Sequence, residues 1–176
     1  ESAILPLISR KIPGVFVNER GVTGFGRDGS SSAGNIFVRG VGGSPNAEVL
    51  VLVDGHPQYM GIFGHPLSNN YVASDLQRVE IIRGPASIIY GSNAMGGVLN
   101  FITKEQKKDG FSGSVRAAYG SFNTQKYLAN TGFKKGKFRM FVSYNHDQTD
   151  GHRDSMNFNI DNAYLKSSYN FSEKLK

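Results

Sequence analysis

The feature that most limits how this chain can fold is a change in the spacing of its apolar residues near residue 110. From there on, apolar and polar side chains alternate one by one over segments of about 9 to 11 residues, the length of a tilted strand that crosses a membrane. A period of two places the apolar side chains on one face of each strand. We therefore expect four amphipathic strands, whose apolar faces contain Val115, Ala117 and Tyr119; Tyr127, Ala129, Thr131 and Phe133; Phe138, Met140, Val142 and Tyr144; and Ala163, Leu165, Ser167, Tyr169 and Phe171.

The aromatic residues and the connections between these strands favour a membrane β-barrel. Of the 20 aromatic residues, 12 lie in the last 70 residues, several of them at strand ends, where outer-membrane barrels carry their interfacial girdles. Residues 134–137 predict a tight turn and residues 145–156 a longer polar loop. A soluble antiparallel meander with one wet face has the same alternation, so the pattern alone leaves both folds open. Four strands cannot close a barrel, and further strands are expected from a longer protein or from a second chain.

Residues 1–106 follow a different pattern and predict a separate domain. They hold 16 of the 22 glycines, and their short apolar runs are continuous rather than alternating. Such runs predict strands that are buried on both faces, at residues 35–39, 49–53, 79–82 and 98–103. Two short helices are predicted at residues 3–10 and 85–90. This part of the chain is therefore expected to be a small α+β domain.

Composition excludes several classes of protein. The net charge of +6 arises wholly after residue 106, because residues 1–106 hold 8 basic and 8 acidic residues and residues 107–176 hold 12 and 6. The basic residues fall at turns and on one side of strands, which does not predict a nucleic-acid platform. The chain has no cysteine and therefore no thiolate metal site or disulfide. Its purest apolar run, Val49 to Val53, is far shorter than a spanning helix, and neither a signal peptide nor an initial Met is present, so we expect the chain to lie within a longer mature protein.

Three segments together resemble the plug of TonB-dependent outer-membrane receptors. They are LVLVDG at residues 50–55, LQRVEIIRGP at 76–85 and YGSNAMGGVLNFI at 90–102, supported by IPGV at 12–15 and FVRG at 37–40. The resemblance implies an α+β plug domain at residues 1–106, inside an antiparallel transmembrane β-barrel of which residues 107–176 supply the first four strands. It also implies a place in the outer membrane of a Gram-negative bacterium.

The resemblance implies roles for three charged residues of the plug. Arg39 and Arg83 are similar to plug arginines that pair with glutamates of the barrel wall, which would lie beyond residue 176. A buried arginine without a partner is costly, so we expect these two side chains to form half of an interface. Glu80 offers an alternative partner within the plug, and both arginines could also be ordinary surface residues after strands.

The segment after the Asp54-Gly55 pair carries the candidate ligand-binding residues. In haem receptors of this family, an apical plug loop with a Gly-His-x-Leu sequence supplies an axial ligand to the haem iron, and this chain has Gly64-His65-Pro66-Leu67. His65 is thus the expected iron ligand, and Tyr59, Met60 and Phe63 are expected to pack against the porphyrin. An incidental loop histidine is the alternative, and His56 is a nearby competitor that we expect at a strand end.

The family implies a transporter with no covalent chemistry and no intrinsic cofactor, in which haem is the carried ligand. Its expected partners are TonB with ExbB and ExbD, the remaining barrel strands, outer-membrane lipid and a surface lipoprotein. The chain shows no Ser, His and Asp set and no carboxylate pair in a pocket motif, so we do not expect an enzyme. A siderophore or cobalamin receptor is the alternative within the family. A soluble binding module or adhesin is the alternative from another class.

Overall fold

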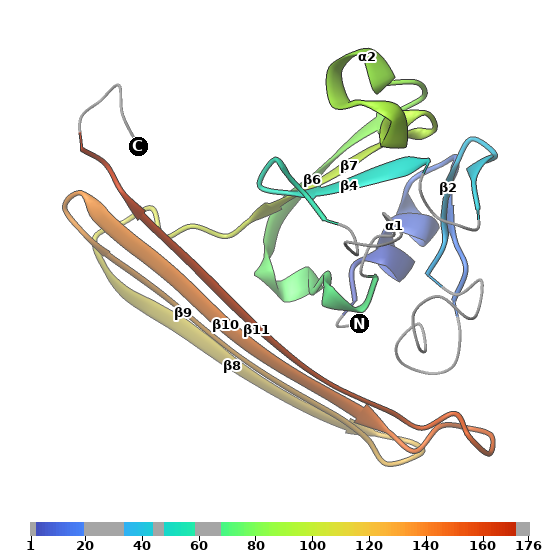
Figure 1. The fold of residues 1–176 in the computed structure, drawn as a ribbon. Helices are drawn as coiled ribbons and strands as arrows, with labels where there is room; N and C mark the ends of the chain where they lie inside the picture. Colours follow the sequence, from blue (N-terminus) through green and yellow to red (C-terminus); the bar gives the residue numbers. More distant parts are fainter. Residues whose placement is uncertain (1–2, 20–33, 44–47, 59–67, 172–176) are drawn as a thin grey trace. The chain divides into compact units, whose positions relative to one another are not determined.

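In the computed structural model the chain divides into two compact units, Glu1–Thr103 and Lys104–Lys176. The structure describes residues 3–19, 34–43, 48–58 and 68–171, which are drawn as a coloured ribbon in Figure 1. The sequence predicts a boundary after Gln106, whereas the units meet after Thr103.

The first unit begins with a short helix and a three-stranded sheet. Helix α1 (Leu5–Lys11) has a proline in its first turn and Arg10 and Lys11 in its last turn, where cations complement the helix dipole. It starts later than predicted, because Ala3 instead forms a β-bridge with Val72. Strands β1 (Val15–Val17), β2 (Ile36–Val38) and β3 (Val41–Gly42) follow in the order β1-β2-β3, and both pairings are antiparallel.

A four-stranded sheet forms the centre of the first unit. Its order is β5-β4-β7-β6, with bounds His56–Pro57 for β5, Val49–Val53 for β4, Gly97–Thr103 for β7 and Leu76–Arg83 for β6. Strands β4 and β7 are parallel, and the other neighbours are antiparallel. The prediction of strands buried on both faces is confirmed for β4 and β7. It is wrong for β6, which lies at the edge of the sheet and exposes Arg78, Glu80 and Ile82.

The side chains of β4 explain why this strand is apolar at every position. Val49 and Val51 belong to the main core, together with Leu5, Ile36, Leu99 and Phe101, whereas Leu50 and Leu52 belong to a second cluster with Ala86, Ala94 and Val98. A strand covered on both faces needs continuous rather than alternating apolar character. The second cluster includes Ala86, directly before the one-turn helix α2 (Ser87–Tyr90), which ends at Gly91 with φ of 87°. This helix is shorter than the predicted residues 85–90.

Three 3₁₀ turns complete the first unit: Ser68–Asn70, Ala73–Asp75 and Ser92–Ala94. Between the first two, Tyr71 is buried with its ring centroid 5.0 Å from that of Phe101, which anchors this stretch on the core. In the described part of the chain, no helix has both the length and the apolar character needed to cross a membrane.

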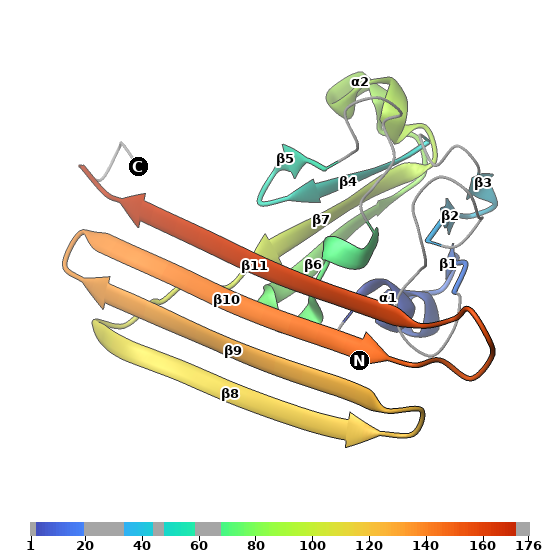
Figure 2. The same ribbon diagram turned by 60° about the horizontal axis from the view of Figure 1, so that its bottom comes forward.

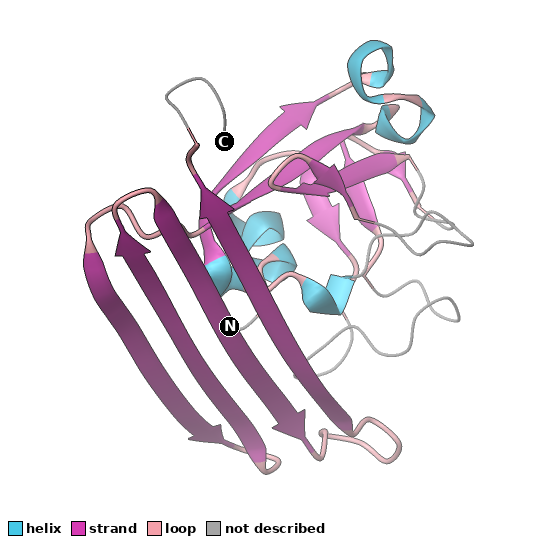
Figure 3. Ribbon diagram, turned by 60° about the vertical axis from the view of Figure 1, so that its left-hand side comes forward, coloured by secondary structure: helices cyan, strands magenta, loops and turns pink. Residues whose placement is uncertain are grey.

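The second unit is a sheet of four long antiparallel strands in the order β11-β10-β9-β8, seen side by side in Figures 2 and 3. Their bounds are Gly110–Gly120 for β8, Thr124–Lys135 for β9, Phe138–Thr149 for β10 and Phe158–Tyr169 for β11. The prediction that a loop begins at residue 145 is wrong, because β10 continues to Thr149. Polar residues stand on both faces of its last four residues, so hydropathy does not reveal this part of the strand.

The pairing register confirms the predicted division of side chains between the two faces. Val142 lies opposite Thr131 on one neighbouring strand and Leu165 on the other. Val115 likewise lies opposite Ala129. All the side chains predicted for the apolar face of these four strands, apart from Phe171 beyond the end of β11, therefore share one side of the sheet. Within the described residues, β8 and β11 each pair along one edge alone.

Candidate functional site

The proposed haem-binding residues lie outside the described part of the structure. His65, Gly64, Tyr59, Met60 and Phe63 all fall within residues 59–67, so their expected roles stay predictions. The structure fixes the residues on either side of this segment. The backbone N–H of Gln58 donates to the carbonyl of Val51 at 2.8 Å, and the buried Ser68 hydroxyl donates to the carbonyl of Gly34 at 3.0 Å.

These two hydrogen bonds hold the residues that flank residues 59–67 in the sequence. On the N-terminal side lies β5, where the competitor His56 pairs with Val53 at the edge of the four-stranded sheet. On the C-terminal side, the buried hydrogen bond joins Ser68 to Gly34, 34 residues earlier in the chain.

Arg39 and Arg83 come together at the turn formed by Pro13 and Gly14. The N–H of Arg39 donates to the carbonyl of Gly14 at 2.7 Å, and Nη1 of Arg83 donates to the carbonyl of Pro13 at 3.1 Å. Arg39 has a φ of 52°, a left-handed conformation that few residues other than glycine adopt. Both side chains are exposed, and among the described residues neither has a carboxylate partner. The sequence did not predict this convergence, although each of the three segments belongs to the resemblance.

Glu80 pairs with a different arginine from the two considered in the sequence. Its carboxylate lies 2.8 Å from the guanidinium of Arg78 and accepts a hydrogen bond from Nδ2 of Asn100 at 3.2 Å. Glu80 and Asn100 are opposite each other in the β6–β7 pairing, which explains this contact. In the described part of the chain, Glu80 is therefore not the internal partner of Arg39 or Arg83.

Asp54 links the ends of the parallel strands β4 and β7, a structural role that was not predicted from the sequence. It follows β4 with a φ of 49°, and its Oδ1 accepts a hydrogen bond from the N–H of Thr103 at 2.9 Å. Its Oδ2 accepts a second from the Thr103 hydroxyl, and the N–H of Gly55 donates to Oδ1 of Asn100 at 3.1 Å. An Asp-Gly pair directly after an apolar strand was the signal for this turn.

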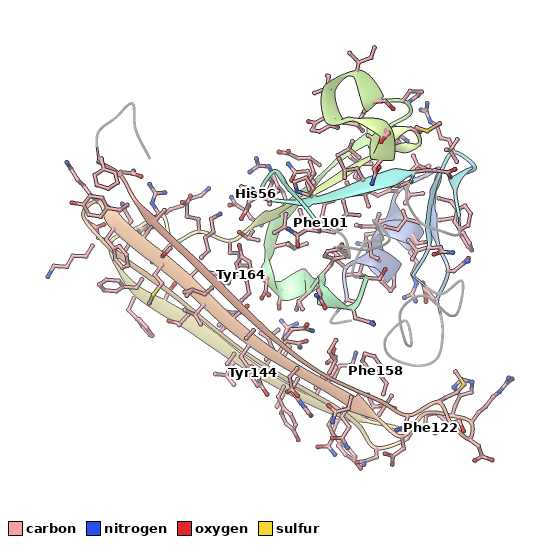
Figure 4. All side chains as sticks on the ribbon, viewed as in Figure 1. His56, Phe101, Phe122, Tyr144, Phe158 and Tyr164 are labelled. Atoms are coloured by element: carbon pink, nitrogen blue, oxygen red, sulfur yellow. The ribbon has the colours of Figure 1, made fainter. Side chains whose placement is uncertain are left out.

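In strands β9, β10 and β11 the sheet of the second unit exposes its apolar face more than its polar face, whereas β8 is exposed on both faces. On the apolar face, Val115 is 84% exposed and Leu165 is 66% exposed, whereas Asn145 on the polar face is 2% exposed. Tyr144 and Tyr164 project from opposite sides of the sheet in Figure 4. A soluble sheet with one wet face buries its apolar side. In this sheet the exposed face is the apolar one, so lipid or another apolar surface must cover it.

Aromatic residues mark both ends of the apolar face. Phe111, Phe133, Phe138 and Tyr169 lie near the 136–137 turn, and Tyr119, Tyr127 and Tyr144 lie toward the other end. Phe111 and Tyr119 are separated by about 26 Å along the strand, or about 20 Å along the membrane normal at a tilt of about 40°. This is close to the roughly 25 Å apolar band of outer-membrane barrels.

Beyond the tyrosines the same face becomes polar. Nδ1 of His146 lies 2.8 Å from Oδ1 of Asp161, which also accepts a hydrogen bond from the Tyr144 hydroxyl at 2.5 Å. The ring of Tyr127 stacks on that of His146 with centroids 6.0 Å apart. The strands therefore extend past the apolar band, and this polar end marks its limit.

Two aromatic side chains of neighbouring strands meet on the polar face. Phe141 is 5% exposed, and its ring centroid lies 6.4 Å from that of the half-buried Tyr164. The exception in the alternation, Phe141, is thus one member of an aromatic pair within the polar face. In the described part of the chain, no three acidic or histidine side chains gather as a metal ion would need.

Comparison with known proteins agrees with both units. Residues 4–98 match the family model for the TonB-dependent receptor plug domain, which is more than half of the chain. The chain therefore belongs to the TonB-dependent receptor family, and its fold is a plug domain followed by four antiparallel strands of a barrel wall that they do not close.

Solved receptors of this family superimpose over most of the chain. The ferric citrate transporter FecA is 25% identical, with 96% of this chain covered and a TM-score of 0.68. The ferric yersiniabactin uptake receptor FyuA of Yersinia pestis is 25% identical over 84% of this chain, with a TM-score of 0.60. The ferric enterobactin receptor PfeA of Pseudomonas aeruginosa is 28% identical over 85%, with a TM-score of 0.57. The chain spans 26%, 22% and 22% of the length of these three receptors.

Proposed function

We propose that this chain is the front part of an outer-membrane receptor of a Gram-negative bacterium, which binds a scarce nutrient at the outer face and admits it to the periplasm. The observation that carries this proposal is the polarity of the second unit. Its exposed apolar face with aromatic ends suits a lipid-facing wall, and its polar face suits a wet lumen. Membership of the TonB-dependent receptor family supports the same function.

Transport in this proposal is a conformational event without covalent chemistry. A plug held by polar contacts in a wet lumen can shift or open locally while the barrel stays folded. TonB, energised by ExbB and ExbD, is the proposed source of that movement, and a surface lipoprotein is a candidate helper at the outer face. Arg39 and Arg83 would hold the resting plug through carboxylates of the remaining wall.

Haem is the first candidate for the transported ligand. His65 supports it, because a neutral imidazole nitrogen is a good axial ligand for haem iron, and Tyr59, Met60 and Phe63 lie within six residues of it in the sequence. The residues that flank residues 59–67, Gln58 and Ser68, are held to the plug by hydrogen bonds.

A ferric chelate is the second candidate, favoured by the structural comparisons. The three receptors described above are a ferric citrate transporter, a ferric yersiniabactin uptake receptor and a ferric enterobactin receptor. When the chelator fills all coordination positions of the iron, the metal needs no ligand from the protein. In that case His65 would have no special role in binding.

Haem titration of the intact receptor separates the two candidates. We expect wild type to shift the Soret band on binding, and His65→Ala to lose the shift and bind at least tenfold more weakly, which is the loss of about 1.4 kcal/mol. His56→Ala is the matched control, because His56 lies in β5 at the edge of the sheet and should leave the spectrum unchanged. Identical spectra for wild type and His65→Ala would remove His65 from the site, and binding of ferric citrate without haem would favour the second candidate.

The receptor class itself is tested by how the intact protein partitions. We expect it in the outer-membrane fraction and dependent on detergent for extraction, because lipid must cover the apolar face. A compact monomer that is soluble without detergent would contradict the proposal and favour a binding module or adhesin.

A further inference from the structure

Residues 104–109 connect the plug to the first barrel strand and are held on the polar face of the sheet. We call this segment the strap. It starts after Thr103, the last residue of β7, and ends before Gly110, the first residue of β8. It belongs entirely to the second unit.

An ion pair joins the start of the strap to β10. Oε1 of Glu105 lies 2.9 Å from Nη1 of Arg139, and the two side chains are 30% and 16% exposed. Exposed ion pairs contribute little to stability, but this pair is largely shielded from water, where removing one partner leaves an unpaired charge. The space around it is lined by Lys104, Gln106, Phe141 and Lys166, so the pair is enclosed by side chains of the strap and of two strands.

The middle of the strap lies against β8 and β9. The hydroxyl of Ser112 donates to Oε1 of Gln106 at 2.7 Å, and Nε2 of Gln106 donates to the carbonyl of Lys108 at 3.0 Å. Directly below Gln106 is Gly132, where an added Cβ would come within 2.9 Å of Oε1 and 3.3 Å of Cβ of Gln106. Glycine at this position thus lets the strap lie flat on the sheet.

The end of the strap is held by Lys134 of β9. Its Nζ donates to the carbonyl of Lys107 at 3.0 Å and forms an ion pair with Asp109 at 3.2 Å. Ser112 is opposite Gly132 in the register, and Lys134 is opposite Arg139. The strap is consequently fixed at three successive points by residues of three adjacent strands.

We propose that the strap is a fixed anchor that keeps the plug's C-terminal end attached to the wall during transport, so that the plug moves about the junction of Thr103 and Lys104. This inference rests on the proposed transport function. Its physical basis is that the strap's four polar contacts to the sheet all lie on the second unit, and they would have to break together for the strap to peel off. Movement of the plug requires none of them to break.

A disulfide across the strap tests whether it must leave the sheet. The Cβ of Gln106 lies 3.3 Å from an added Cβ at Gly132, slightly under the 3.5–4.5 Å range of disulfides, and residues 1–176 hold no cysteine of their own. Any cysteine in the remaining sequence of the receptor is replaced by serine. The intact receptor carrying Gln106→Cys with Gly132→Cys is assayed for energy-dependent uptake of haem and of ferric citrate, oxidised and then reduced. The two single-cysteine variants are the controls for each substitution alone.

We expect the oxidised double variant to take up the ligand within about twofold of its reduced form, since a fixed anchor is already immobile. Uptake that is lost on oxidation and restored on reduction would overturn the anchor. A wild-type receptor that takes up neither haem nor ferric citrate would instead count against the proposed function. In that case limited proteolysis tests whether the strap is a fixed anchor.

Limited trypsin cleavage after Lys107 tests the anchor without any transport. Cleavage requires the strap to open locally, so its rate reports how firmly the strap is held. We expect Glu105→Gln and Arg139→Gln each to raise the rate on the order of tenfold, and the exchange Glu105→Arg with Arg139→Glu to restore most of the protection. Equal cleavage rates in wild type and both single variants would overturn the anchor, while unaltered mobility on a detergent gel shows that the variants fold.

Discussion

The carboxylate of Asp54 binds both the N–H and the hydroxyl of Thr103, 49 residues further along the chain, with the N–H bond at 2.9 Å. Asp54 stands at the end of β4 and Thr103 at the end of β7, the two central parallel strands of the plug. Parallel strands cannot be joined by a tight hairpin, so their ends must be matched by other contacts. This pair fixes the ends of β4 and β7 at the point where the chain leaves the plug for the barrel wall.

Asp54→Ala should therefore destabilise the plug. The substitution removes two acceptors and leaves the buried Thr103 hydroxyl and N–H without this partner, which costs about 1–3 kcal/mol. Denaturant unfolding followed by plug-specific hydrogen exchange measures the loss. Asp154→Asn, in the exposed 150–157 loop, is the control and should change the free energy of unfolding by less than about 0.5 kcal/mol. Equal effects of the two substitutions would mean that the Asp54 contacts add nothing.

Gly97→Ala should destabilise the plug more than Gly91→Ala. Both glycines have positive φ, 152° and 87°, but a Cβ at residue 97 would lie 2.5 Å from the carbonyl oxygen of Ile82, whereas a Cβ at residue 91 has nothing within 4 Å. Backbone strain alone costs about 1–2 kcal/mol, and the clash at residue 97 adds to it. Thermal unfolding of the two variants side by side measures the difference. A Tm for Gly97→Ala equal to or above that of Gly91→Ala would show that β6 can shift away from the added methyl group without cost.

The faces of the second unit could be predicted from the sequence, because a period of two assigns each side chain to a side without knowledge of the pairing. The bounds of β4 were also predicted, because five consecutive apolar residues in a small plug domain must be buried, and a run of this length forms a strand. Strands β1, β3 and β5 were not predicted. They have two or three residues each, and their pairing depends on tertiary contacts rather than on local pattern.

Contacts between distant segments could not be predicted either. The meeting of Arg39 and Arg83 at Pro13 and Gly14 joins three segments that no local rule links. The pairing of Glu80 with Arg78 follows from the register of β6 on β7, which the sequence does not state. The contacts of the strap with the sheet were not predicted, because they depend on the space above Gly132.

Val115→Arg should prevent insertion of the barrel wall, whereas Ser114→Arg should not. Val115 lies near the middle of the apolar face, where an arginine costs about 2–4 kcal/mol in an outer-membrane barrel. Ser114 is the neighbouring residue on the polar face and already faces polar side chains, with its hydroxyl donating to Asn130 at 3.0 Å. Folding yield of the intact receptor into lipid vesicles, read from heat-modifiable gel mobility, compares the two. Similar yields would show that Val115 does not face lipid.

Arg39 and Arg83 should hold the resting plug through carboxylates that lie outside this chain. We expect Arg39→Ala with Arg83→Ala to raise the proteolytic susceptibility of the plug in the intact receptor several-fold, because two charge-assisted contacts are lost. Arg78→Ala is the control, since Arg78 already pairs with Glu80 inside the plug. An intact structure in which both guanidinium groups lie in bulk water would contradict this expectation.

We propose that the strands after residue 110 form a wall with lipid on the apolar face and water on the polar face. Residues 1–176 hold no cysteine, so spin labels can be placed one at a time at residues 111 to 119 of the intact receptor in lipid vesicles, with any cysteine of its remaining sequence replaced by serine. We expect labels at Phe111, Val115 and Tyr119 to collide with oxygen dissolved in the bilayer, and labels at Ser112, Ser114 and Arg116 to collide with a water-soluble nickel chelate. Labels at both sets of positions that respond equally to the nickel chelate would contradict it.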